Sequence, residues 1–435
     1  MSARSFLSIW FGQAVSTFGS SLTAFVVSAW LYERSRSATL VALVWIATTL
    51  PDLLLSPFAG VLVDRWNRRW AMIVSDLGSA AGTLTMALLA LIDRLQVWQI
   101  LAATAWISIF GTLLWPAYSA AMAQLLPRQQ LGRANGLVQV GDSAARLAAP
   151  ILAGVLLVRI HLAGVLLIDF ATFAASLLAL SLARVPPPPH GGAPRRPVLD
   201  EVATGWRYIQ HRRGLLALLV YFAGVNIAAG FAQVLITPLV LSFATPAVLG
   251  TVMSIGGIGL LAGSLLLGAW GGGRSPIRSV LAFTGLMGIS VLACGLAPWP
   301  LLIGLGVAGS YFATPLVEGA SQVLWQSKTS PEVLGRVFAL RKVTALCSRP
   351  VAYVFAGVLD DRVFEPAMAP GGALVGTAGR LLGVGTGRGA AALFCLSGLV
   401  MVGVALAGCL YGPLRRIDRE LPDVTEVSPV AAAES

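Results

Sequence analysis

The sequence contains few charged residues and few of the side chains that bind metals. Only 11% of its 435 residues are Asp, Glu, Lys or Arg, against about 25% in a typical soluble protein, which argues against a soluble globular fold. Its three histidines and four cysteines show no metal-ligand spacing, so we expect no metal site and no cofactor. The phosphate-binding pattern G-x-x-x-x-G-K-[ST] is also absent, so the chain carries no nucleotide-driven motor of its own.

Long apolar stretches dominate the sequence instead. A bilayer core is crossed by a helix of about 20 apolar residues, and twelve such stretches are bounded by charge, proline or glycine. We therefore predict an all-α integral membrane protein. The first stretch is too long for a cleavable signal peptide. The predicted spans are 6–31, 39–62, 71–92, 96–124, 136–158, 163–183, 214–242, 248–270, 279–297, 301–326, 337–359 and 390–412.

The net charge of +11 has a topological explanation. If both termini are cytoplasmic, 21 of the 30 Lys and Arg residues fall on the cytoplasmic side and seven on the outer side. Arg146 and Arg349 fall inside predicted helices. The positive-inside rule thus predicts a multi-pass protein of the cytoplasmic (inner) membrane in this orientation. The basic excess gives no reason to expect nucleic acid as a partner.

A proline-rich stretch divides the spans six to six. We predict an N-terminal six-helix bundle at 1–184, a cytoplasmic linker with an amphipathic helix at 185–213, a C-terminal bundle at 214–412 and a cytoplasmic tail at 413–435. The halves repeat each other at an offset of 203 residues: 131–133 matches 334–336, Arg146 matches Arg349, and 153–156 matches 356–359. Parallel six-helix repeats are typical of two-bundle secondary transporters, whose substrate site lies near mid-membrane between the halves.

The loop after the second span carries a family motif. Residues 60–69 read Gly-Val-Leu-Val-Asp-Arg-Trp-Asn-Arg-Arg, which resembles the G-x-L-x-D-R-x-G-R-[RK] element of the major facilitator superfamily. The resemblance implies twelve transmembrane helices in two six-helix bundles. It also implies a cytoplasmic gate in which the acid caps a helix of the opposite bundle and the basic residues latch it. The gate residues would be Gly60, Asp64, Arg65, Arg68 and Arg69.

One position departs from this motif. Asn67 stands where the family has glycine, and because Asn can adopt a left-handed turn conformation the departure is mild. A loop that is positive only for topology would explain Arg68 and Arg69, but not Asp64 and Gly60.

The fifth span carries a second resemblance. Its small residues and proline are spaced as in the G-x8-G-x3-G-P-x2-G-G motif of facilitator antiporters; they are Gly136, Ala149, Pro150 and Gly154. Small residues also let helices pack closely, so simple packing is the alternative. Residues 199–209 resemble the helix before span 7 in the drug-exporter branch that contains macrolide-efflux and enterobactin-exporter proteins.

Seven charged residues inside the predicted spans are not explained by topology: Asp52, Asp76, Asp142, Arg146, Asp169, Glu318 and Arg349. Each costs about 2.5–3.5 kcal/mol at the bilayer centre, so each calls for a partner or a function. Asp142 and Arg146 share a helix face, where an ion pair would lower that cost. Glu318 and Asp52 have no cation nearby in the sequence. We predict Glu318 and Asp52, then Asp142, as proton carriers, although the fourth span lacks the arginine found in many facilitator antiporters.

The family resemblance also indicates which helices line the central cavity, namely spans 1, 4, 7 and 10. Their polar and aromatic residues are the candidates for substrate contact, against the alternative that each simply packs or lies at the membrane interface. The candidates are Gln13, Trp115, Tyr118, Asn226, Gln233, Tyr311, Gln322 and Trp325.

These observations favour a secondary transporter. We expect a monomer that exports an amphipathic small molecule, such as an antibiotic or siderophore, by alternating access in exchange for protons. A lipid or lysolipid flippase of the same fold is the first alternative. A receptor of the same fold and an integral-membrane enzyme are further ones, although no G-x-S-x-G or H-E-x-x-H motif supports catalysis.

Overall fold

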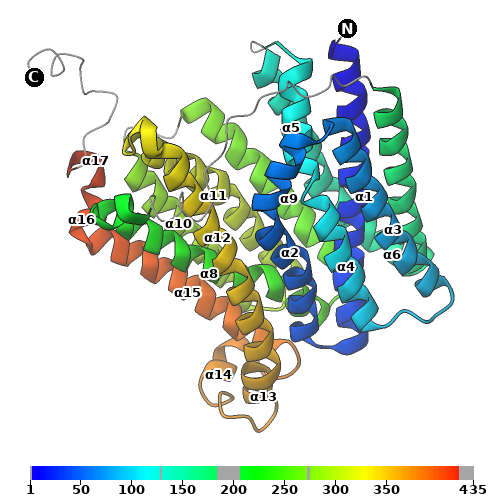
Figure 1. Ribbon diagram of the computed structural model, residues 1–435. Coiled ribbons are helices and arrows are strands. Elements are labelled where there is room, and N and C mark those ends of the chain that lie inside the picture. Colours follow the sequence, from blue (N-terminus) through cyan, green and yellow to red (C-terminus); the bar gives the residue numbers. More distant parts are fainter. Residues whose placement is uncertain (1, 128–129, 184–205, 272–274, 421–435) are drawn as a thin grey trace, which may run out of the picture. The chain divides into compact units, whose positions relative to one another are not determined.

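The protein is helical throughout its described parts. The computed structural model describes residues 2–127, 130–183, 206–271 and 275–420, and all regular secondary structure in these ranges is helical (Figure 1). Eleven helices in these ranges are long and apolar enough to cross a membrane. The prediction of an all-α membrane protein is confirmed.

The helices follow one another in chain order. Their bounds are α1 Ser2–Ser35, α2 Ala38–Arg65, α3 Arg68–Leu91, α4 Val97–Gly111, α5 Leu114–Leu125, α6 Leu131–Leu182, α8 Arg213–Leu241, α9 Pro246–Trp270, α10 Pro276–Leu296, α11 Pro300–Ser327, α12 Pro331–Leu359, the π-helical turn η2 Asp360–Phe364, α13 Glu365–Met368, α14 Ala378–Leu382, α15 Arg388–Leu410, α16 Gly412–Arg415 and α17 Ile417–Glu420.

Two predicted spans are joined in α6. The element α6, Leu131–Leu182, covers both 136–158 and 163–183. It consists of two helical parts that meet in a kink at His161, whose φ of 56° is not helical. The eleven membrane-length segments therefore include one that contains two predicted spans. The opposite difference occurs at 96–124, where Thr112 and Leu113 separate α4 from α5.

Prolines mark where several helices begin. The helices α9, α10, α11 and α12 start at Pro246, Pro276, Pro300 and Pro331. Proline is favoured at the first helical position because its fixed φ suits the helix and its missing N–H would be unpaired there anyway. The local sequence thus sets four helix starts in the second half of the chain.

Contacts divide the chain into two compact units. The first comprises Met1–Pro194, Val234–Gly257 and Tyr353–Ala390; the second comprises Arg195–Gln233, Ile258–Ala352 and Ala391–Ser435. In the first, α1 and α3 pack against α6, and in the second α10 packs against α11. The six-to-six division at 1–184 and 214–412 follows chain order and stays a prediction. Most of the predicted linker, 184–205, and the end of the tail, 421–435, lie outside the described residues.

Helices α6 and α9 approach each other closely in the first unit. A Cβ atom added at Gly154 would lie 2.5 Å from the Pro246 carbonyl oxygen, and one at Gly250 would collide with the carbonyl of Pro150. Because backbone atoms form these contacts, a larger side chain cannot be accommodated by a change of rotamer. Gly136, on the same helix as Gly154, has nothing within 4 Å of its Cβ position.

The N-terminus of α2 is capped by a carboxylate from far along the chain. Asp361 accepts hydrogen bonds from the Ala38 and Thr39 amides, both at 2.9 Å, and from the Ser37 hydroxyl. The Ser37 oxygen accepts from the Leu40 amide at 3.3 Å. The amides of the first three residues of α2 are therefore paired, and the capping carboxylate complements the helix dipole.

The segment 360–389, between α12 and α15, contains short helical elements. It includes η2, α13 and α14. Its glycine-rich end forms a turn in which the Gly387 and Gly389 amides donate to the two carboxylate oxygens of Glu365, at 2.6 and 3.0 Å. Both amides therefore already have a hydrogen-bond partner within the protein, the carboxylate of Glu365.

Gly154→Val should destabilise the protein. The valine side chain would overlap the backbone of α9, at a cost of about 1–3 kcal/mol. We expect the midpoint of thermal unfolding, followed by tryptophan fluorescence in detergent, to fall by several degrees. The control Gly136→Val, placed in open space on the same helix, should change it little. Equal effects of the two substitutions would contradict this account of the packing.

Asp361→Ala should expose the first amides of α2. Loss of an N-terminal cap costs about 0.5–2 kcal/mol, so the Ala38 and Thr39 amides should exchange hydrogen for deuterium faster. Asp361→Asn, which keeps one acceptor oxygen, should show an intermediate rate. Exchange in this peptide that is unchanged in Asp361→Ala would mean that the contact does not hold the helix end.

Candidate ligand pocket

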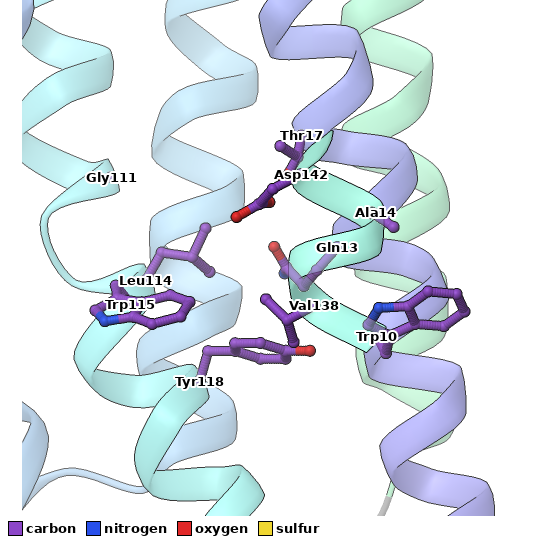
Figure 2. Close-up of a pocket in the computed structure, with 11 residues that line it drawn as sticks. Trp10, Gln13, Ala14, Thr17, Gly111, Leu114, Trp115, Tyr118, Val138 and Asp142 are labelled. Atoms are coloured by element: carbon purple, nitrogen blue, oxygen red, sulfur yellow. The ribbon is translucent and has the colours of Figure 1, made fainter. Parts of the chain in front are cut away.

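A cavity of about 160 Å³ lies among the helices of the first unit. It is bounded by α1, by the break between α4 and α5, and by the first part of α6 (Figure 2). Aromatic rings and a few polar groups share its walls. The lining residues are Trp10, Gln13, Ala14, Thr17, Gly111, Leu114, Trp115, Tyr118, Val138, Gly141 and Asp142.

The break between α4 and α5 places two aromatic residues beside the cavity. Pro116 lies in the first turn of α5 and has no N–H to continue the hydrogen bonding of α4, which favours a new helix start here. Trp115 and Tyr118 follow on the new helix with ring centroids 6.2 Å apart. Figure 2 shows both rings directed toward the cavity. The predicted candidates Gln13, Trp115 and Tyr118 are thus brought together.

Two polar atoms beside the cavity lack partners. The indole nitrogen of Trp10 and the hydroxyl of Tyr118 are buried, and neither forms a hydrogen bond with any residue that the structure describes. A buried polar group left unpaired costs about 1–3 kcal/mol. A hydrogen-bonding molecule in the cavity would remove that cost.

The cavity also contains a carboxylate. Asp142 is half-buried and points into the cavity in Figure 2. Arg146, one turn further along α6, lies close enough to attract it electrostatically, yet its own side chain is exposed. The ion pair predicted from their spacing is not present in the described residues; only a longer-range attraction is, so Asp142 remains available to a ligand.

Gln13 connects the cavity to a buried polar cluster. Its Nε2 donates to Asp76 Oδ2 and to Ser176 Oγ, both at 3.0 Å, and the Ser176 hydroxyl donates to the same Asp76 oxygen at 2.7 Å. All three side chains are at least nine-tenths buried. The sequence identified Asp76 only as one of seven charges in the spans that topology does not explain. Ser176 and Gln13 carry no local signal that they would be its partners.

A second buried aspartate links α6 to α1. Asp169 on α6 accepts hydrogen bonds from Thr23 at 2.6 Å and from Ser20 at 3.4 Å, both on α1, and from Thr172 at 3.3 Å. Asp76 and Asp169 therefore both have protein partners that explain their presence in an apolar helix bundle.

The second unit contains a polar cluster of its own. Arg341 on α12 donates to Gln322 Oε1 on α11 at 2.8 Å and lies within electrostatic range of Glu318, one turn before Gln322. Arg341 is one of the 21 basic residues that the predicted topology places on the cytoplasmic side. The folded chain instead places it beside two of the predicted site residues, so Glu318 does have a cation nearby.

The other candidates of the second unit are more dispersed. Trp325 is fully buried in α11, and Asn226 is half-buried in α8. Gln233 and Tyr311 are exposed. Among the remaining predicted charges, Asp52 is half-buried in α2 and Arg349 is exposed in α12.

The predicted gate motif lies at the turn between α2 and α3. Asn67 has a φ of −63° and caps α3 by accepting from the Arg69 amide at 3.0 Å. Asn67 therefore does not use a left-handed backbone here and acts as a helix cap. Gly60 lies within α2, and the side chains of Asp64 and Arg65 lie outside the described residues.

Two arginines of the motif have different surroundings. The Arg69 guanidinium donates to the carbonyls of Leu180 at 2.8 Å and Ser181 at 2.6 Å, at the C-terminus of α6. Cations are favourable at that end of a helix. Two buried nitrogens of Arg68 have no hydrogen-bond partner in the described part of the chain. Arg69 thus stabilises its own half of the chain.

No group of three or more His, Cys, Asp or Glu side chains that could hold a metal ion occurs among the described residues.

Comparisons with known proteins agree with one family. A sequence model of the Major Facilitator Superfamily matches residues 9–352. Macrolide efflux protein A of Streptococcus pyogenes is 28% identical over 373 residues, which cover 82% of this chain and 90% of that protein. The multidrug efflux pump Tap of Mycolicibacterium fortuitum is 26% identical over 370 residues, covering 82% and 89%.

Solved structures show the same fold. The nucleoside transporter NupG matches with a TM-score of 0.72 at 12% identity, covering 93% of this chain and 99% of that one. A bacterial homologue of the iron transporter ferroportin, in an inward-facing state, matches with a TM-score of 0.66 at 14% identity, covering 92% and 98%. At this identity the likeness concerns the fold alone, and it confirms the predicted twelve-helix arrangement.

Tyr118→Phe should not lower stability. The substitution removes a buried hydroxyl that has no partner in the described residues, so the midpoint of thermal unfolding should stay the same or rise slightly. Thr23→Val is the matched comparison, because it removes a hydroxyl that donates to Asp169 at 2.6 Å, and its midpoint should fall by several degrees. A fall in Tyr118→Phe as large as that in Thr23→Val would show that the tyrosine hydroxyl is paired.

Proposed function

The chain belongs to the major facilitator superfamily, and on that premise we propose that it exports an amphipathic small molecule by alternating access, in exchange for protons. Family membership makes the protein a membrane transporter rather than an enzyme. The substrate and the coupling ion form the proposal. The names of the relatives, a macrolide efflux protein and a multidrug efflux pump, support export of an antibiotic-like compound.

The cavity in the first unit is the observation that carries this proposal. Aromatic faces of Trp115 and Tyr118 line one side, the carboxylate of Asp142 lies at another, and buried polar atoms of Trp10 and Tyr118 lack partners in the described residues. Such walls suit an apolar group that carries a few polar atoms. At about 160 Å³ the cavity has room for such a part of an antibiotic or siderophore rather than for the whole molecule.

Carboxyl groups provide the route for coupling to protons. A carboxyl that is reached in turn from each side of the membrane binds a proton on one side and releases it on the other. The candidates are Asp142 in the cavity, Glu318 near Arg341 in the second unit, and Asp52 in α2. We further propose that both termini are cytoplasmic, that the protein lies in the inner membrane, and that it acts as a monomer.

Transport by reconstituted vesicles tests the proposal. Purified protein is placed in liposomes with a pH-sensitive dye inside, a macrolide is added, and proton movement is recorded together with uptake of the labelled macrolide. We expect the substrate to drive proton flux. Substitution of the carrier, by Asp142→Asn, Glu318→Gln or Asp52→Asn, should reduce coupled flux by at least about tenfold, since general acid–base groups typically contribute more than that.

The control is Asp93→Asn, which changes an exposed acid in a turn where φ is 56° and Asn is tolerated. Substrate transport without proton movement would overturn the antiport proposal. Coupling retained in all three carboxyl variants would overturn the choice of residues. Movement of a labelled lysolipid but not of the macrolide would instead identify a lipid flippase of this fold.

A further inference from the structure

The amide nitrogen of Gln13 is held inside the helix bundle. Its nitrogen donates to Asp76 Oδ2 and to Ser176 Oγ. The Ser176 hydroxyl has only one proton, and because that proton is donated to Asp76, the serine oxygen acts toward Gln13 as an acceptor. Three side chains from α1, α3 and α6 thus form a closed triangle.

This triangle determines which group Gln13 offers to the cavity. Because its nitrogen is held against Asp76 and Ser176, the amide directs its carbonyl oxygen, an acceptor, away from them. Figure 2 shows that oxygen directed into the cavity, on the same side as the carboxylate of Asp142. Turning the amide over would set its oxygen against two acceptors, Asp76 Oδ2 and Ser176 Oγ, and would leave buried hydrogen bonds unmade.

We propose that Asp76 and Ser176 are positioning residues that make Gln13 a hydrogen-bond acceptor toward the ligand, so that the cavity selects molecules with a charged N–H group. This inference rests on the proposed export function and names its ligand class. An ammonium head donates to Gln13 and Asp142 through charge-assisted hydrogen bonds. The apolar body of the molecule packs on Trp115 and Tyr118, whose rings also attract the cation.

A matched control lies on α6. Asp169 is as buried as Asp76, at 1% exposure for each, and it too accepts hydrogen bonds from α1, from the Thr23 and Ser20 hydroxyls. It does not contact Gln13 and does not line the cavity. Asp169→Asn therefore reproduces the general damage of removing a buried charge but leaves the Gln13 amide held.

Two probes distinguish the contribution of the N–H group to binding from the contribution of the positive charge. A dansyl group on a five-carbon chain ending in a primary ammonium is compared with the same molecule ending in a trimethylammonium, which has the charge but no N–H. Binding of each to the full-length protein in lipid nanodiscs is followed by dansyl fluorescence. We expect the wild-type protein to bind the primary ammonium about tenfold more tightly, the effect of one charge-assisted hydrogen bond.

The variants then assign the preference to residues. In Gln13→Leu the acceptor is absent, and in Asp76→Asn the new amide can donate, so the Gln13 amide is free to turn over. In both, the affinity ratio should fall clearly, to the value that the hydrogen bond to Asp142 alone supports. The trimethylammonium probe should bind these variants nearly as well as wild type. Asp169→Asn should keep the tenfold ratio. Ser176→Ala, a milder change, should lower it to roughly threefold and serves as the test if Asp76→Asn does not fold.

Several results would overturn the inference. They are a wild-type protein that binds both probes equally or neither, a tenfold ratio that persists in Asp76→Asn or Ser176→Ala, and a ratio lost equally in Asp169→Asn. None of these would affect the export proposal, which depends on macrolide transport and proton movement in vesicles. Failure of the two proposals is therefore distinguishable.

Discussion

Polar side chains inside membrane-spanning helices must find their partners within the protein, because the lipid core offers none. The first unit meets this constraint by pairing: Asp76 and Asp169 receive hydrogen bonds from α1 and α6, and so connect helices that apolar packing alone would leave free to slide. Two of the buried polar atoms in the first unit that have no hydrogen-bond partner among the described residues, at Trp10 and Tyr118, lie beside the cavity, where a ligand could pair with them.

The same constraint also shows how the two units differ. In the first, the acid of the cavity, Asp142, has only a distant attraction to Arg146 and points into open space. In the second, Glu318 lies near Arg341, which also donates to Gln322. An acid without a paired cation suits ligand binding, whereas an acid beside a cation suits a change of protonation that breaks the attraction. The family supplies the architecture, and these local arrangements supply the chemistry.

Much of the fold could be predicted from the sequence, because span length and hydropathy depend on local composition. Helix starts at proline and the family motif at 60–69 are local too. The partners of Asp76 could not be predicted, since Gln13 and Ser176 lie 63 and 100 positions away from it and carry no distinguishing pattern. The cap formed by Asn67 could not be predicted for a related reason: the residue tolerates either a left-handed turn or a cap, and only the folded chain selects one.

The central claim is that the exported molecule binds in the cavity among α1, α5 and α6. A cryo-electron microscopy map of the protein in nanodiscs with a saturating macrolide tests it most directly. The account predicts ligand density in that cavity, in contact with Asp142 and within hydrogen-bond distance of the Tyr118 hydroxyl. Clear density for the macrolide at another site, with this cavity empty, would contradict it.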